Sequence, residues 1–131
     1  MTYHFSTTVE KGFDDAVAAT KEALKRHHFR LLTEIDMRDN LKKGLNVEFR
    51  PYLIIGACNP ALTYRALKAE DKLGVLLPCN IIVQQQENGN VEVSAVDPVL
   101  SMGAIDHVVV AQVAQDIRSH LQQVVDEVGR T

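Results

Sequence analysis

The sequence predicts an α+β domain in which a single antiparallel sheet carries helices on one face. Segments rich in β-branched residues alternate in strand fashion over much of the chain, and an Asn88–Gly89 step typical of a hairpin separates two of them. The last quarter of the chain instead carries an apolar stripe at helical spacing. The expected order is β-α-β(4)-α, with short helical insertions between the strands.

The first third of the chain predicts two strand and helix pairs. Residues 3–9 alternate as a strand, and a helix is expected from Phe13 to about His28, with acidic residues in its first turn and basic ones in its last. Residues 29–35 form the next strand, with the odd-numbered side chains on one side. Asp36 is the expected N-cap of a short helix that Gly44 ends.

The middle of the chain predicts a strand over residues 47–57. Because Pro51 cannot donate a ladder hydrogen bond, we expect this strand at a sheet edge or bulged near the proline. Residues 52–57 are apolar with little alternation, which is typical of a strand covered on both faces. Asn59 and Pro60 predict the start of a helix that runs to about Lys72. This long connection leaves open whether the following strand is parallel or antiparallel.

The last part of the chain predicts a hairpin and a long helix. Strands are expected over residues 75–86 and 91–96, joined by a two-residue turn at Asn88–Gly89. Asp106 is the expected cap of the final helix, which ends near Gly129.

The final helix has one continuous apolar side that needs a cover, because propensity alone does not hold a valine-rich helix in water. The stripe comprises Val110, Val113, Ala114, Ile117, Leu121, Val124 and Val128. We expect it to pack on the sheet face that carries Ile81, Val83, Val91, Val93 and Ala95.

Composition excludes some broad classes of function. The 131 residues suit one domain, and 14 basic against 17 acidic residues give a net charge of −3. This balance argues against a general nucleic-acid or membrane-surface partner, since both need basic patches. The sequence shows no signal peptide and no apolar run of membrane-spanning length, so we expect a cytoplasmic protein with reduced cysteines.

The two cysteines share one motif, a Cys-Asn pair beside a proline. Cys58–Asn59 precedes Pro60, and Cys79–Asn80 follows Pro78. Cys58 lies next to a predicted helix N-terminus, a position that favours a thiolate. Met102 and the Asp97–Pro98 step come from a nearby loop, although Asp97–Pro98 is more typical of a turn than of an acid catalyst.

Three hypotheses of function follow from this motif. The first is a small-ligand or soft-metal site. Its candidate ligand-binding residues are Cys58, Asn59, Cys79, Asn80, Asp97 and Met102. Two thiolates and a thioether, from Cys58, Cys79 and Met102, would suit Cu(I) as a cofactor, whereas the spacing for a Cys2His2 zinc site is missing.

The second hypothesis is a thiol-based redox or catalytic protein that uses Cys58, although no general base is placed beside it in the sequence. The third is a structural or interaction subunit in which both cysteines only pack as small apolar side chains. The run Gln84–Gln86, unusual in a strand, is then a solvated or dimer-facing edge, and His4 is a surface or capping residue. None of the common catalytic motifs decides whether the protein is an enzyme.

Three segments resemble one known family. They are Gly56-Ala57-Cys58-Asn59-Pro60, Leu76-Leu77-Pro78-Cys79-Asn80 and Ala95-Val96-Asp97-Pro98. In this order they are similar to the domain-of-unknown-function 302 family of bacterial and archaeal proteins, over nearly the whole chain. The resemblance implies a β-α-β(4)-α fold related to the TATA-box-binding-protein-like class, commonly seen as a homodimer. It implies no activity and no catalytic residues, and a fold relationship alone does not make the protein a DNA binder.

Overall fold

The computed structural model describes residues 2–131 and contains one five-stranded sheet. The strands are β1 (His4–Val9), β2 (Arg30–Asp36), β3 (Tyr52–Cys58), β4 (Cys79–Gln85) and β5 (Val91–Val96). Their spatial order is β1-β5-β4-β3-β2, and every neighbouring pair is antiparallel. The sheet confirms the predicted fold class. It also shows that the long connection between β3 and β4 joins antiparallel neighbours.

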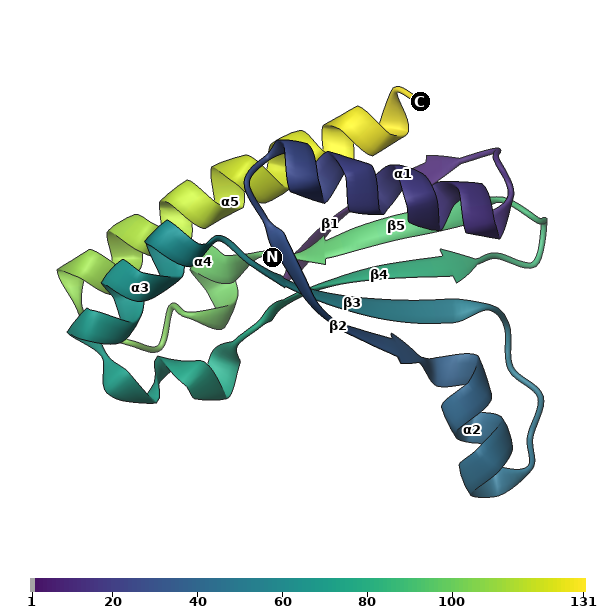
Figure 1. The fold of residues 1–131 in the computed structure, drawn as a ribbon, viewed down its shortest axis with the longest axis horizontal. Helices are drawn as coiled ribbons and strands as arrows, with labels where there is room; N and C mark the ends of the chain where they lie inside the picture. The colour runs from purple at the N-terminus through teal and green to yellow at the C-terminus, as the bar shows by residue number, and fades with distance from the viewer. Residues whose placement is uncertain (1) are drawn as a thin grey trace.

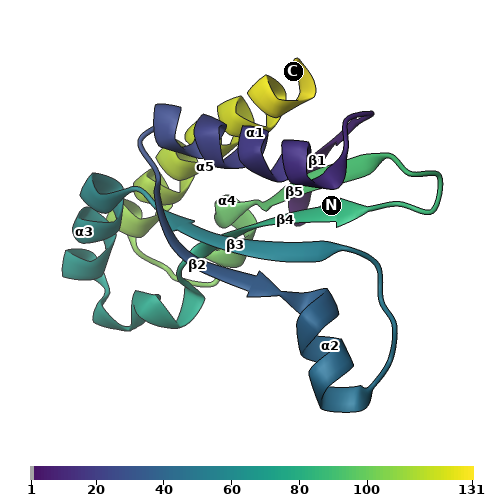
Figure 2. The same cartoon turned by 45° about the vertical axis from the view of Figure 1, so that its right-hand side comes forward.

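The helices occupy one face and the two ends of this sheet. They are α1 (Phe13–Arg26), α2 (Met37–Leu45), α3 (Pro60–Ala69), the 3-10 helix η1 (Asp71–Leu76), α4 (Pro98–Ser101) and α5 (Val108–Gly129). Helices α1 and α5 lie side by side over one face, and α3 packs against α5 (Figure 1). Helix α2 projects away from the rest of the molecule, as the rotated view also shows (Figure 2). The face of the sheet opposite α1 and α5 is therefore not covered by either helix.

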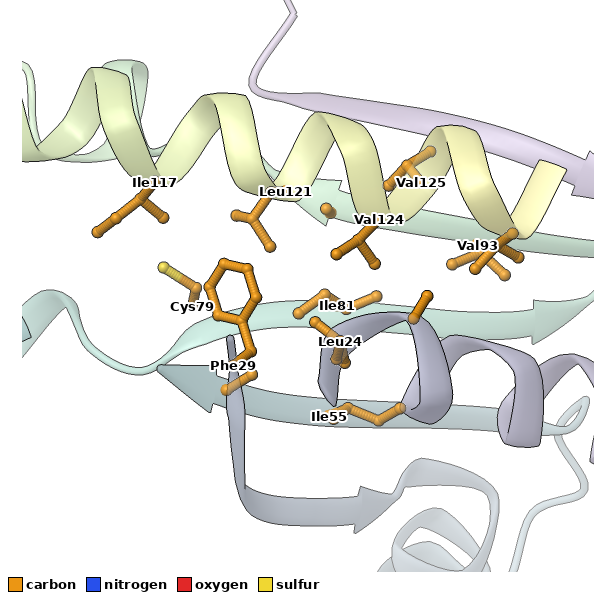
Figure 3. Packing of buried hydrophobic residues seen from close by; sticks show 14 of the residues in the cluster. Leu24, Phe29, Ile55, Cys79, Ile81, Val93, Ile117, Leu121, Val124 and Val125 are labelled. Carbon is orange, nitrogen blue, oxygen red and sulfur yellow. The ribbon is translucent and has the colours of Figure 1, made fainter. Parts of the chain in front are cut away.

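The core lies between α5, α1 and the central strands (Figure 3). All seven residues of the predicted α5 stripe are buried, and so are the five residues of the predicted sheet face. Since α5 spans 22 residues, this packing runs along most of the sheet. No helix within residues 2–131 combines the length and the apolar character needed to cross a membrane.

Two predicted helix caps are confirmed. The Asp36 carboxylate accepts a hydrogen bond from the Asp39 N–H at the start of α2, over 2.9 Å. The Asn59 side chain likewise accepts one from the Leu62 N–H at the start of α3, over 3.1 Å. Each satisfies a backbone donor that the first turn of a helix leaves unpaired.

Two other helix boundaries differ from the prediction. Helix α2 continues through Gly44 and ends at Leu45, and the left-handed backbone of the next residue, Asn46 (φ 54°), closes the helix as glycine often does. The cap of α5 is His107 rather than Asp106, because the His107 ring accepts a hydrogen bond from the Val109 N–H over 3.1 Å.

The β4–β5 hairpin has a three-residue loop instead of the predicted two-residue turn. Gln86 and Asn90 still pair, through a hydrogen bond from the Gln86 N–H to the Asn90 carbonyl. The loop consists of the three residues between them, and Gly89 alone has a positive φ, of 88°. A two-residue type I′ turn would need Asn88 in that region as well, so the loop is instead typical of a type I turn followed by a left-handed glycine.

Strand β3 is shorter than predicted and lies in the sheet interior. Pro51 is neither at an edge nor in a bulge, because the strand begins after it, and its carbonyl accepts a hydrogen bond from the Gln85 N–H. Residues 46–51 instead form the return from α2. The helices cover only one face of β3, so Tyr52 and Ile54 are half-buried on the other, and the expectation of cover on both faces is wrong.

A bulge in β2 changes which side chains share a face. Arg30 and Leu31 pair with Cys58 and Ala57, whereas Thr33 already pairs with Gly56, so that Leu32 is an extra residue. The predicted single row of odd-numbered residues is therefore interrupted. Leu31 lies on the helix-covered side with buried Ala57, and Thr33 lies on the other side against Gly56.

We expect Leu121→Ala to lower the free energy of unfolding by about 2–5 kcal/mol, because this fully buried leucine would leave a cavity between α5 and the sheet. Gln123→Ala, on the exposed side of the same helix, is the matched control and should change it by less than about 0.5 kcal/mol. Gln122 is less suitable, because it is half-buried and hydrogen-bonded to Asp126. Urea unfolding of both variants makes the comparison, and equal losses would contradict the orientation of α5.

Candidate functional site

The uncovered face of the sheet contains a hollow of about 360 Å³. It is lined by side chains from β1, β3, β4 and β5 and the residue before β1: Tyr3, His4, Tyr52, Asn80, Ile82, Gln84, Glu92 and Ser94, with Ala95 and Val96 beside them. Strand alternation explains this set, since Ile81, Val83, Val93 and Ala95 point into the core and leave their neighbours on the other side. Ile82 supplies an apolar floor, and polar groups surround it.

A chain of hydrogen bonds connects two of the lining residues, His4 and Ser94, at the β1 side of the hollow. Ser6 and Ser94 are direct partners in the β1–β5 ladder, and their hydroxyl oxygens are 2.7 Å apart. The Ser6 hydroxyl is also 2.9 Å from Nδ1 of His4. Ser94 is only 8% exposed, so its hydroxyl is oriented by this chain rather than by bulk water.

The opposite side of the hollow is built around the amide of Gln84. Its Nε2 donates to Glu92 on β5 over 3.2 Å, and its Oε1 accepts from Nε of Arg50 over 2.8 Å. The Arg50 guanidinium in turn lies over the Phe49 ring, 4.3 Å from its centroid, and 5.6 Å from the Tyr52 centroid. The amide is thus held in one orientation, while Asn80 stands exposed at the other end of β4.

The two cysteines are placed differently by the fold. Cys79 is buried, and its side chain points from β4 into the layer between the sheet and α5 (Figure 3). Cys58 is half-buried at the end of β3, and neither cysteine forms a disulfide. Burial and, to a smaller extent, the Cys58 side chain together raise the pKa of the Cys79 thiol to about 11. Cys79 is therefore a neutral thiol at physiological pH.

The other predicted site residues have structural contacts of their own. Asn59 is buried as the cap of α3. Asp97 caps α4 by accepting from the Val99 N–H over 3.0 Å, and its second oxygen accepts from Nε of Arg118 over 3.1 Å. Met102 is buried at the end of α4. Of the six predicted residues, Asn80 is the one that lines the hollow on the sheet.

Few side chains in residues 2–131 are placed where they could bind a metal ion together. No three histidine, cysteine, aspartate or glutamate side chains of residues 2–131 come together in a group that could hold a metal ion. A site at Cys58 and Cys79 would thus depend on two thiolates and a softer third donor such as the Met102 thioether. The Cu(I) hypothesis stays a prediction.

Sequence reasoning did not assign a site role to several lining residues, among them His4, Tyr52, Gln84, Glu92 and Ser94. The sequence does contain a signal for these residues in β5, because the polar Glu92 and Ser94 alternate with Val91 and Val93, which are buried. Alternation alone predicts a solvated face. The hollow emerges only when the register of four strands is known.

Comparisons with known proteins place the chain in a family. The domain of unknown function DUF302 matches residues 5–128. The chain belongs to the DUF302 family. A crystal structure of an uncharacterised conserved DUF302 protein from Bacillus stearothermophilus has a similar fold, with a TM-score of 0.89 and 25% sequence identity over 97% of this chain and 98% of that one. No curated protein matches this DUF302 chain.

The raised pKa of Cys79 predicts a pH dependence of the stability of this DUF302 protein. The thiol ionises near its ordinary pKa of about 9 in the unfolded chain but near 11 in the folded one, so folding is favoured below pH 9 and this contribution is lost as the pH rises towards 11. We expect the stability difference between the wild type and Cys79→Ala to shrink by roughly 1–1.5 kcal/mol between pH 8 and pH 10. Urea unfolding of both proteins at both pH values measures this change. The ionisation of tyrosine and lysine side chains affects the two proteins alike, so it cancels in the difference. A constant difference would show that Cys79 is not buried as described.

Proposed function

We propose that this protein binds a small, ring-shaped organic ligand on the uncovered face of its sheet. The observation that carries the proposal is the hollow around Ile82, in which side chains from separate strands converge. Ligand sites commonly combine an apolar surface with a few placed polar groups. Here Ile82 and the Tyr52 ring offer apolar contact, and Asn80, Gln84 and Ser94 offer hydrogen bonds.

The charges around the hollow narrow the class of ligand. Glu92 contributes a carboxylate, and among residues 2–131 no lysine or arginine lines the hollow. The guanidinium of Arg50, which donates to the lining residue Gln84, is already engaged in that hydrogen bond. A neutral or cationic ligand with donor groups at its edge therefore fits better than a carboxylate or a phosphate, which would lie against Glu92 without a paired cation.

The oriented polar groups support recognition of a ligand with both donors and acceptors. Either hydroxyl of the Ser6–Ser94 pair can be the donor, so Ser94 can adapt to a ligand that donates or accepts. The Gln84 amide, in contrast, is fixed by Arg50 and Glu92 and presents one edge only. Pre-oriented groups lower the entropy lost on binding.

A thermal-shift screen tests this function with neutral, cationic and anionic ring compounds. We expect stabilising compounds to come from the first two classes, and a compound at one hundred times its dissociation constant should add about 2.7 kcal/mol to the free energy of unfolding. Ile82→Trp should abolish the effect by filling the hollow, and Asn80→Ala should weaken it.

Val108→Trp is the matched control for the tryptophan variant, since Val108 is 70% exposed at the start of α5 and outside the lining of the hollow. Isothermal titration then gives the affinities of all three variants. A compound that stabilises Ile82→Trp as much as the wild type binds elsewhere, and such a result for every compound would refute the proposal.

A second candidate function is Cu(I) binding by Cys58 and Cys79, with Met102 as a further donor. It is favoured by the strand pairing, in which Cys79 lies directly opposite Ala57, the chain neighbour of Cys58. The neutral state of Cys79 opposes it, because a metal must first displace that proton.

An anaerobic titration of the reduced protein with Cu(I) and a competing chelator tests this candidate. We expect one equivalent to bind to the wild type and none to the Cys58→Ser/Cys79→Ser double variant. Met102→Leu keeps the volume of the side chain and should weaken binding if the thioether is a ligand. Equal uptake by the wild type and the double variant would remove the cysteines from the proposal.

A further inference from the structure

The hydrogen-bond chain at the β1 side of the hollow ends on the imidazole of His4. Nδ1 of His4 is 2.9 Å from the Ser6 hydroxyl oxygen, which is 2.7 Å from that of Ser94. The three side chains share one face, because His4 and Ser6 are two positions apart on β1 and Ser6 is the direct partner of Ser94 on β5. The strand register therefore builds a continuous path from the imidazole to a hydroxyl that lines the hollow.

Ser6 couples the two hydrogen bonds, because its hydroxyl has only one proton. If this proton is donated to Nδ1 of His4, the Ser94 hydroxyl is the donor in the Ser6–Ser94 bond, and a lone pair of Ser94 stays free to accept. If Nδ1 carries a proton and donates to Ser6, the Ser6 proton becomes available to Ser94, and the Ser94 proton is then free. The state of the imidazole thus changes what Ser94 can offer to a third group.

The surroundings of Ser94 make this difference matter to a ligand. Ser94 is 8% exposed and lies between Ser6 of β1 and Ile82 of β4 in the sheet. The Ile82 side chain offers no hydrogen bond, and so little exposure leaves bulk water a poor substitute. A ligand group that meets the wrong end of the Ser94 hydroxyl therefore loses a hydrogen bond that nothing replaces.

His4 can change its charge under mild conditions, since histidine side chains as a class gain a proton as the pH falls from 8 to 5. The Tyr3 ring stands edge-on to the imidazole, with the two centroids 4.9 Å apart, and Tyr52 of β3 lines the same hollow. Phenols are neutral between pH 5 and pH 8. The lining side chains of β4 are uncharged: Asn80, Ile82 and Gln84.

Two carboxylates lie on or beside β5, the strand that pairs with β1. Glu92 is four positions from Val96, the partner of His4, which places it about 13 Å away along the strand. Asp97 follows Val96, but its carboxylate accepts a hydrogen bond from Nε of Arg118 on α5 over 3.1 Å and is thus already paired with a cation. The direct route from a protonated imidazole to the hollow is therefore the hydroxyl of Ser6.

We propose that His4 is a positioning residue that acts through Ser6 and determines whether Ser94 presents an acceptor or a donor to a ligand in the hollow. With a neutral imidazole that accepts from Ser6, the site selects rings that donate an N–H or O–H to Ser94. With a protonated imidazole it selects rings that accept a hydrogen bond, such as those with a carbonyl. The inference rests on the ligand site proposed above and adds pH-dependent selection to it.

NMR of the ligand-free protein tests the path itself. We expect the Cβ chemical shift of Ser94 to follow the same midpoint as the imidazole nitrogen shifts of His4 between pH 5 and pH 8.5. Ser6→Ala should remove this dependence, and Ser6→Thr, which keeps a hydroxyl, should restore it. A Ser94 shift that does not change with pH, or that still follows His4 in Ser6→Ala, overturns the inference.

His28→Asn is the matched control for the NMR titration, and it should leave the Ser94 curve unchanged. It removes an exposed histidine outside the lining of the hollow. The backbone of His28 is left-handed, with a φ of 69°, a conformation that asparagine also adopts.

Two neutral probes test the selection by isothermal titration at pH 5 and pH 8.5. Indole offers an N–H donor and N-methylpyridone a carbonyl acceptor, and neither changes charge in this range. We expect the ratio of the indole affinity to the pyridone affinity to fall about tenfold from pH 8.5 to pH 5, as when a buried hydrogen bond is lost. The ratio should not change with pH in His4→Phe, which keeps an aromatic ring, or in Ser6→Ala.

Failure of the inference and failure of the ligand site give different results. If the wild type binds both probes with a ratio that is independent of pH, the inference is overturned and the ligand site stands. If neither probe binds at either pH, the ligand site and the selection both fail. Equal binding of the probes by Ile82→Trp and the wild type would place them outside the hollow and contradict both.

Discussion

The structure depends on the burial of one side of α5 against the central strands. Ile117, Leu121 and Val124 point from α5 towards Cys79 and Ile81 of β4 (Figure 3), and α1 lies alongside α5. Because both long helices lie on the same face, the other face of the sheet has no part in this core. Its side chains are under no demand to be apolar, and polar residues on β4 and β5 can gather there without loss of stability.

Because the sheet has one covered and one uncovered face, the two asparagines of the paired Cys-Asn motif do not share one site. At the start of β4, Cys79 points into the core and Asn80 to the uncovered face, since successive strand residues alternate. At the end of β3, Asn59 is used to begin a helix. Of the two asparagines, Asn59 therefore accepts a hydrogen bond from the backbone, and Asn80 lies on an open surface. Likeness of sequence does not ensure likeness of role.

The parts of the fold that local patterns control could be predicted from the sequence. The α5 stripe, strand β5 and the Asn59 cap each depend on residues within a few positions of one another. The bulge at Leu32 could not, because it is defined by the pairing of β2 with β3, a strand that follows only after α2 and its return segment. The hollow could not either, since it needs the register of four strands, and Asn80 was the only one of its lining residues that the motif indicated.

The β2 bulge has a further consequence at this edge of the sheet. An edge strand with a regular ladder is a template to which further strands can add, one molecule after another. Here Leu32 shifts the side chains by one position, so a straight partner strand cannot match both halves of β2 at once. The irregularity makes this edge a poor template for open-ended growth of the sheet into fibres.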